Sequence, residues 1–166
     1  TENLDQTLPL LAIRGFGQSE VQMVPLHMAM VAGAVANGGQ MMRPYVVDAT
    51  YDRADRELNR TSPSIWKTPI SAETAALETE FMIGVVQSGT ASCCMTLDGG
   101  IQAAAKNGTA ELGLESNPDL SHAWIIAFAP AENPQFAISV VLTNVQSTQD
   151  VSATGGRLAG PIAKGM

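Results

Sequence analysis

Two stretches combine dense apolar residues with good helix formers, and each ends at a glycine. Residues 24–37 carry alanine, methionine and valine nearly all around the helix axis, and Asn37-Gly38-Gly39 then gives a left-handed C-cap signal. Residues 72–88 follow Ser71, a residue type that caps helix N-termini, and their apolar positions form a stripe. The pattern predicts a buried helix over 24–37 and an amphipathic helix over 72–88.

Beyond residue 100 the apolar residues fall into short runs that are typical of strands. The runs cover about 101–112, 122–129 and 135–143, and their short connections predict an antiparallel three-stranded meander. A closing helix is expected over about 157–165. Before the meander, residues 42–70 are expected to be extended and residues 1–20 to be a mixed segment with a loop at its glycines. Helices that flank a run of strands indicate an α+β fold.

Composition and charge narrow the classes of function. The chain has 166 residues, of which 45% are hydrophobic and 15% charged, so we expect one globular domain over 1–166. A net charge of −7 argues against nucleic acid and anionic membranes as partners. No stretch approaches the roughly 20 apolar residues of a membrane span.

Cysteine and histidine give no sign of a metal or cofactor site. Cys93 and Cys94 are adjacent. Since neighbouring Cα atoms lie ~3.8 Å apart, below the usual disulfide range, we expect two packed thiols. His27 is expected to be a hydrogen-bonded core residue and His122 to be structural. No His or Cys cluster indicates a metal, and we expect no cofactor.

The segment Lys106-Asn107-Gly108-Thr109 carries the most chemistry. Strand alternation places Lys106 and Gly108 on one face and Asn107 and Thr109 on the other, so a ligand of both Lys106 and Asn107 must lie along the strand edge. The neighbouring alanines leave room for strand addition, Lys106 supplies a positive charge for a carboxylate, and Asn107 supplies a donor. Backbone N–H groups after Gly108 suit a polarised carbonyl.

Two other interpretations of this segment stay open at the level of sequence. Asn-Gly between two runs is a hairpin-turn signal, although the alanine-rich flanks lack clean alternation. Asn107-Gly108-Thr109 also matches the short N-glycosylation pattern, as does Asn59-Arg60-Thr61.

Further segments occur in a fixed order around this motif. They are Gly17-Gln18-Ser19-Glu20, Pro25-Leu26-His27-Met28-Ala29, Ala36-Asn37-Gly38-Gly39, Arg43-Pro44, Ile70-Ser71-Ala72-Glu73-Thr74-Ala75, His122-Ala123-Trp124, Phe128-Ala129-Pro130-Ala131, Gly155-Gly156 and Ala159-Gly160-Pro161-Ile162-Ala163. Together with residues 100–111 they resemble the penicillin-binding protein transpeptidases, whose third strand usually carries Lys-Thr-Gly-Thr or Lys-Ser-Gly-Thr. The resemblance covers nearly the whole chain.

The resemblance implies a partial transpeptidase or β-lactamase-like domain and a peptidoglycan D,D-transpeptidase that works through a serine acyl-enzyme. Its implied partners are the stem peptide, β-lactam antibiotics and the rest of the same domain. It also implies an extracytoplasmic parent protein, anchored in the cell membrane, that acts in cell-wall synthesis and cell shape. Lys106, Asn107, Gly108 and Thr109 would bind the substrate, and Thr109 matches the position whose N–H helps form the oxyanion hole.

Three departures from the family pattern bear on activity. The family's nucleophile lies in Ser-x-x-Lys upstream of these segments, but the match in this chain, Ser64-Ile65-Trp66-Lys67, comes in the wrong order. Ser-x-Asn does not occur, and Asn107 replaces a hydroxyl residue. We therefore expect the C-terminal part of a transpeptidase domain that is inactive alone. Through an exposed apolar face and an open sheet edge, it is expected to form a dimer or to have low solubility. A non-catalytic penicillin-binding module, a β-lactam sensor or an unrelated α+β interaction domain are the alternatives.

Overall fold

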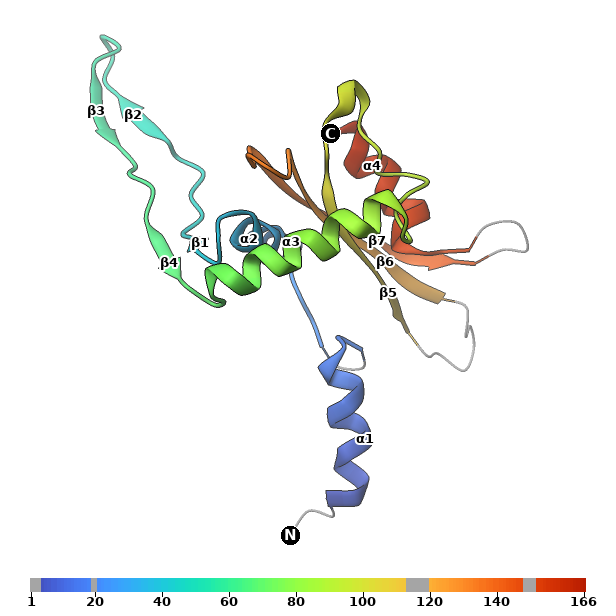
Figure 1. Cartoon of the computed structure of the whole chain (residues 1–166). Helices are drawn as coiled ribbons and strands as arrows, with labels where there is room; N and C mark the ends of the chain where they lie inside the picture. Colours follow the sequence, from blue (N-terminus) through green and yellow to red (C-terminus); the bar gives the residue numbers. More distant parts are fainter. Residues whose placement is uncertain (1–3, 19–20, 113–119, 148–151) are drawn as a thin grey trace.

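The computed structural model describes residues 4–18, 21–112, 120–147 and 152–166, and these residues form an α+β fold (Figure 1). The helices are α1 (Leu4–Gly15), α2 (Pro25–Ala36), α3 (Ala72–Gln87) and α4 (Gly160–Gly165), with a 3-10 turn η1 (Asp98–Gly100) and a π-helical turn η2 (Gly155–Ala159). The strands are β1 (Met41–Met42), β2 (Ala49–Tyr51), β3 (Glu57–Arg60), β4 (Ile65–Lys67), β5 (Ala104–Glu111), β6 (Leu120–Ala129) and β7 (Phe136–Gln146). Within the described residues no helix is long and apolar enough to cross a membrane.

The predicted meander is confirmed as the antiparallel sheet β5–β6–β7. Gly108 lies opposite Trp124 and Ala104 opposite Phe128, which fixes the register of β5 on β6. β5 begins at Ala104 rather than near residue 101, because Gly99 and Gly100 have positive φ angles in the turn η1 that precedes it. The sheet therefore has β5 at one edge and β7 at the other.

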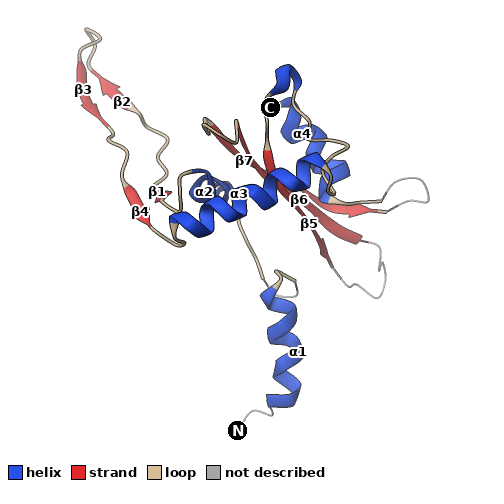
Figure 2. Cartoon of the chain, in the orientation of Figure 1, coloured by secondary structure: helices blue, strands red, loops and turns tan. Residues whose placement is uncertain are grey.

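Alternation along the strands divides the sheet into two buried faces. On one face, Ala104 and Phe128 pack with Met82 of α3, next to residues of α2. On the other face, Ala105 and Ile125 pack in a second cluster whose members from elsewhere in the chain are Val86, Ala91, Met95, Ala159 and Ala163. Figure 2 shows the strands with helices gathered around them. Burial on both faces holds the backbone of β5 in place.

The predicted helices are confirmed with small changes at their ends, and one helix was missed. α2 and α3 end one residue earlier than expected, and the closing segment begins as the π-helical turn η2. Residues 4–15 form α1, although a mixed segment with a loop at its glycines was expected there. Leucines favour a helix on both sides of Pro9, and Ala12 and Arg14 favour it after Pro9. The chain leaves the helix at Gly15, shortly before Gly17 with its φ of 83°.

The expectation that α2 is buried all round is wrong. Only Ala32 and Ala34 are buried along this helix, while Leu26 is 61% exposed. His27 is half-buried and faces the ring of Trp66, with 6.5 Å between the ring centroids, and no described residue hydrogen-bonds to its imidazole. It is therefore not the hydrogen-bonded core histidine that the sequence indicated.

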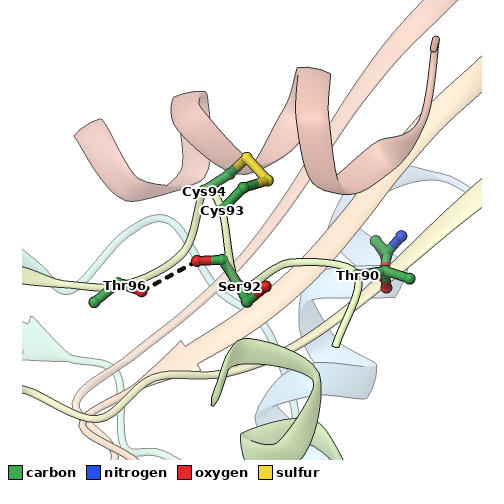
Figure 3. Close-up of a disulfide and its surroundings, with 6 residues drawn as sticks. Thr90, Ser92, Cys93, Cys94 and Thr96 are labelled. Atoms are coloured by element: carbon green, nitrogen blue, oxygen red, sulfur yellow. Dashed lines mark hydrogen bonds between the residues drawn. A yellow bond between two sulfur atoms is a disulfide. The ribbon is translucent and has the colours of Figure 1, made fainter. Parts of the chain in front are cut away.

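Cys93 and Cys94 form a disulfide, so the prediction of two packed thiols is wrong (Figure 3). The usual Cα range describes bridges between separate segments, whereas these two side chains span a single peptide unit, with 3.8 Å between the Cα atoms. The pair lies in the turn that follows α3. Cys94 packs against Gly160 of α4. A Cβ added to Gly160 would lie 3.1 Å from the Cβ of Cys94.

Residues 41–67, which we call the arm, are extended as predicted. They form two small antiparallel ladders, β1 with β4 and β2 with β3. In Figure 1 the β2–β3 hairpin projects away from the sheet. Met41 is the only residue of the arm that is buried.

Candidate functional site

The residues singled out by the sequence lie on β5, the strand at one edge of the sheet. Lys106, Asn107, Gly108 and Thr109 occupy consecutive positions within β5 and lie opposite residues 123–126 of β6. Asn107-Gly108 is therefore part of a strand, and the interpretation as a hairpin turn is wrong. Ala104 and Ala105, directly before Lys106, are 0% exposed, so they hold the start of the strand rather than leave it bare.

The predicted alternation along β5 is confirmed. Lys106 and Gly108 share a face with Ala104, which packs near α2 and α3. Asn107 and Thr109 share the opposite face with Ala105, which packs near η2 and α4. A single ligand can reach side chains of both faces only from the free edge of β5.

Two carbonyl oxygens of β5 already accept hydrogen bonds from side chains at this edge. The Lys106 ammonium donates to the carbonyl oxygen of Asn107 at 2.5 Å, and the side-chain amide of Gln18 donates to the carbonyl oxygen of Thr109 at 3.0 Å. In an antiparallel strand the N–H and C=O of one residue point the same way, so the N–H groups of Asn107 and Thr109 also face away from β6. The edge thus offers a donor and an acceptor at each of two alternate residues.

The Asn107 side chain has a partner outside the sheet. The hydroxyl of Thr90, which follows α3, donates to its Oδ1 atom at 2.5 Å. Sequence analysis missed both Thr90 and the contact of Gln18, because neither a 17-residue nor a 91-residue separation leaves a periodic signal. Gln18 stood only within a segment quoted for the family resemblance.

A glycine lets the C-terminal segment approach the site from the side of η2. A Cβ added to Gly155 would lie 1.9 Å from the carbonyl oxygen of Trp124 and 2.6 Å from that of Gly108. Such contacts do not occur in proteins, so only glycine allows η2 to lie this close. The close approach of η2 supports the paired backbones of β5 and β6 at Gly108 and Trp124.

A shallow cavity of about 250 Å³ adjoins the same part of β5. Phe16, Gln18 and Met28 line it from one side, while Gly108 and Trp124 line it from the sheet. The cavity is mainly apolar and opens beside the position where Gln18 bonds Thr109. An extended ligand on β5 would have room there for an apolar group.

The other candidates do not join this site. The Nδ1 atom of His122 accepts the backbone N–H of Asn144 at 3.1 Å, where β7 has an irregular register, so His122 has the structural role that was expected. Ser64 precedes β4 and lies on no helix, which agrees with its exclusion as a nucleophile. Among the described residues no three His, Cys, Asp or Glu side chains gather as a metal site requires.

Comparison with known proteins identifies the family. Residues 10–166 match the family model described as the penicillin binding protein transpeptidase domain. The chain is 36% identical over 154 residues to the peptidoglycan D,D-transpeptidase PbpA of Mycolicibacterium smegmatis. The aligned residues cover 93% of this chain and 30% of that protein. Penicillin-binding protein 3 of Bacillus subtilis is 29% identical over 148 residues, with 87% of this chain and 20% of that protein covered.

Solved structures agree with this assignment. The crystal structure of PBPA from Mycobacterium tuberculosis is 36% identical and superposes with a TM-score of 0.81 over 94% of this chain and 36% of that one. Its ceftriaxone acyl-enzyme complex superposes with a TM-score of 0.83 over 93% of this chain and 34% of that one. The chain belongs to the penicillin-binding protein transpeptidase domain family, and it spans between a fifth and about a third of the length of these relatives.

Proposed function

We propose that this chain supplies the carboxylate-binding strand of a peptidoglycan D,D-transpeptidase. The observation that carries the proposal is the free edge of β5, where Asn107 and Thr109 present backbone groups beside the Lys106 ammonium. A stem peptide that ends in D-alanyl-D-alanine would add to this edge as an extended strand. A β-lactam would occupy the same place, in keeping with the acyl-enzyme structure of a relative.

Each polar group of the site has a distinct role in this proposal. Lys106, which is exposed, would turn from the carbonyl of Asn107 to the ligand carboxylate. The amide of Asn107 would donate a further hydrogen bond to the same carboxylate. The N–H of Thr109 would polarise the carbonyl under attack, and the Thr109 carbonyl would accept the ligand N–H in place of Gln18.

The nucleophile is proposed to lie elsewhere in the protein to which this chain belongs. Ser64, in the Ser-x-x-Lys match of this chain, directly precedes β4 and so belongs to the arm rather than to the sheet that contains β5. We therefore expect intact-mass spectrometry of the 166-residue chain incubated with penicillin to find no covalent adduct. A stoichiometric adduct on any serine of the chain would contradict the proposal.

Lysine substitution in the whole transpeptidase tests the role of β5. Lys106→Ala removes the charge-assisted contact, which corresponds to roughly 1.5–3 kcal/mol of ligand binding, and should slow acylation by a fluorescent penicillin. Lys67→Ala is the matched control, because Lys67 lies on the arm over the ring of Trp66. Equal acylation rates of the parent and Lys106→Ala would show that β5 is only structural.

A non-catalytic penicillin-binding module is the second candidate, and Asn107 is the observation that favours it. An amide in place of the family's hydroxyl changes the donor geometry next to the ligand carboxylate. Acylation of the whole protein by a fluorescent penicillin separates the two candidates, and in a catalytic protein Asn107→Thr should acylate at an unchanged or higher rate. A module that never acylates should keep reversible binding alone, with and without the substitution.

The proposal extends to location and association. Peptidoglycan lies outside the cytoplasm, so we place the protein in the extracytoplasmic space, with a membrane anchor outside this chain. The opposite edge of the sheet, at β7, would pair with a second copy or with the rest of the transpeptidase domain and so leave β5 to the ligand. Sedimentation of the chain at high concentration tests self-association, for which we expect a dimer and which a clean monomer would contradict.

A further inference from the structure

The side-chain amide of Asn107 is held in one orientation by a residue outside the sheet. Its Oδ1 atom accepts the hydroxyl proton of Thr90 at 2.5 Å. An amide oxygen can only accept, so the hydroxyl must be the donor. The Nδ2 atom of Asn107 makes no hydrogen bond to any described residue and is not among the buried unsatisfied atoms, so it keeps some exposure to solvent.

The backbone of Thr90 is itself fixed, so the hydroxyl is a stable anchor. The next residue, Ala91, is fully buried, and its N–H donates to the carbonyl of Val85 in α3. On the other side, a Cβ added to Gly156 would lie 2.2 Å from the Thr90 carbonyl oxygen, so η2 packs directly against it. The contact with Asn107 thus connects β5 to the ends of two other elements.

We infer that Thr90 is a specificity-determining positioning residue, which makes the site select a ligand with a terminal carboxylate over one with a terminal carboxamide. With Oδ1 occupied by Thr90, Asn107 presents only donors, and these complement a carboxylate whose oxygens only accept. A carboxamide would bring its own donor group toward the donors of Asn107 and Lys106. The inference rests on the proposed function, because it assumes that the ligand end binds at β5.

Removal of the Thr90 hydroxyl frees the amide to turn. In Thr90→Val the Oδ1 atom loses its donor, and rotation of the amide presents an acceptor to the ligand. The carboxylate ligand then loses a hydrogen bond, while the carboxamide ligand gains one. Thr90→Ser keeps the hydroxyl and is the matched control.

The experiment compares binding of N-acetyl-D-Ala-D-Ala and of its C-terminal carboxamide to the 166-residue chain, measured by NMR titration. The ratio of the two affinities should fall by about tenfold in Thr90→Val, the loss expected for one hydrogen bond to a charged group, and stay within about twofold in Thr90→Ser. The resonances of the Asn107 side-chain amide should move in Thr90→Val and not in Thr90→Ser. A merely structural role would weaken both peptides equally and leave the ratio unchanged.

The outcomes separate the inference from the proposed function. If the unmodified chain binds neither peptide, the proposed role of β5 fails and the inference fails with it. If the unmodified chain prefers the carboxylate and Thr90→Val keeps that preference, only the inference is overturned. Thr90→Ala is a second variant without the hydroxyl, and the backbone amide spectrum of each variant reports whether it is folded.

Discussion

The sheet β5–β7 and the arm are both built from antiparallel strands, but they are stabilised in different ways. Ile125 and Ala105 in the sheet are fully buried, whereas Val46 in the arm is fully exposed. The arm relies on its ladders and on exposed ion pairs, in which Arg60 contacts Asp48 and Glu57 at 2.5 and 2.6 Å. A strand that must present polar groups in a fixed position needs packing on both faces, and within the described residues only the sheet provides it.

Truncation of a large side chain should separate the two regions most strongly. Phe128 of β6 is 1% exposed and packs in one cluster with Met82 of α3. Phe128→Ala should therefore lower the free energy of unfolding by about 3–5 kcal/mol. Leu58 of the arm is 68% exposed, and Leu58→Ala should change it by no more than about 0.5 kcal/mol. Urea unfolding of both variants measures the difference. Similar losses would mean that the arm is packed as tightly as the sheet.

Two glycines of the site region give the next contrast. Gly155→Ala places a Cβ against two carbonyl oxygens and should destabilise the chain by about 3 kcal/mol, the upper part of the usual range for overpacking. Gly108→Ala meets only the Cβ of Trp124 at 3.8 Å, an ordinary contact, so the sheet should tolerate it. Thermal unfolding of the pair tests the close approach of η2. A stable Gly155→Ala variant would contradict it.

The N-terminus of α3 offers a smaller effect at the boundary between the arm and the helices. Ser71 accepts the backbone N–H of Thr74 at 3.1 Å, as a helix N-cap does. Ser71→Ala should cost about 1 kcal/mol of unfolding free energy, whereas Ser71→Asp should restore most of it. If urea unfolding gave Ser71→Ala the stability of the parent chain, the cap would contribute nothing.

The tip of the arm should show the smallest effect, as a shift in a titration. Hydrogen bonds from the backbone N–H of Arg56, from its side chain and from the N–H of Ala54 lower the pKa of Asp52 below its ordinary value. The carboxylate therefore stabilises the hairpin above the ordinary pKa of an aspartate, and this contribution is lost as the pH falls through the lowered pKa. NMR titration of the Asp52 carboxyl carbon measures the midpoint.

Arg56→Ala is a control for the cause of that shift. It removes the side-chain donor and leaves both backbone donors in place, so the pKa of Asp52 should rise only part of the way to its ordinary value. A complete return would assign the whole shift to the guanidinium group. A midpoint at the ordinary value in the parent chain would mean that the turn is not formed in solution.

Local patterns predicted the parts of the fold that depend on local sequence. The alternation of Lys106 and Asn107 followed from strand geometry, and the N-cap at Ser71 and the C-cap of α2 at Asn37 followed from residue type. The contacts that complete the site could not be predicted in this way. Thr90 and Gln18 reach β5 from other elements, and their placement depends on how the chain packs.

Errors arose where one rule was extended beyond its domain. The Cα distance range for disulfides does not apply to neighbours such as Cys93 and Cys94. Glycines at the end of a segment marked a loop there, but they did not exclude the helix α1 before them. The apolar surface of α2 indicated a fully buried helix, yet Leu26 and its neighbours near the N-terminus remain exposed. Apolar character alone therefore overestimated the burial of this helix.

The most direct test of the account is to map ligand binding on the backbone amides of the chain. In an NMR titration with N-acetyl-D-Ala-D-Ala, we predict the largest shifts at Asn107 and Thr109, whose N–H groups face the free edge, together with movement of the Gln18 side-chain amide. Lys106→Ala should abolish these shifts, and Lys67→Ala should leave them unchanged. Shifts confined to the arm, or no shifts at β5 at concentrations that perturb other residues, would contradict the account.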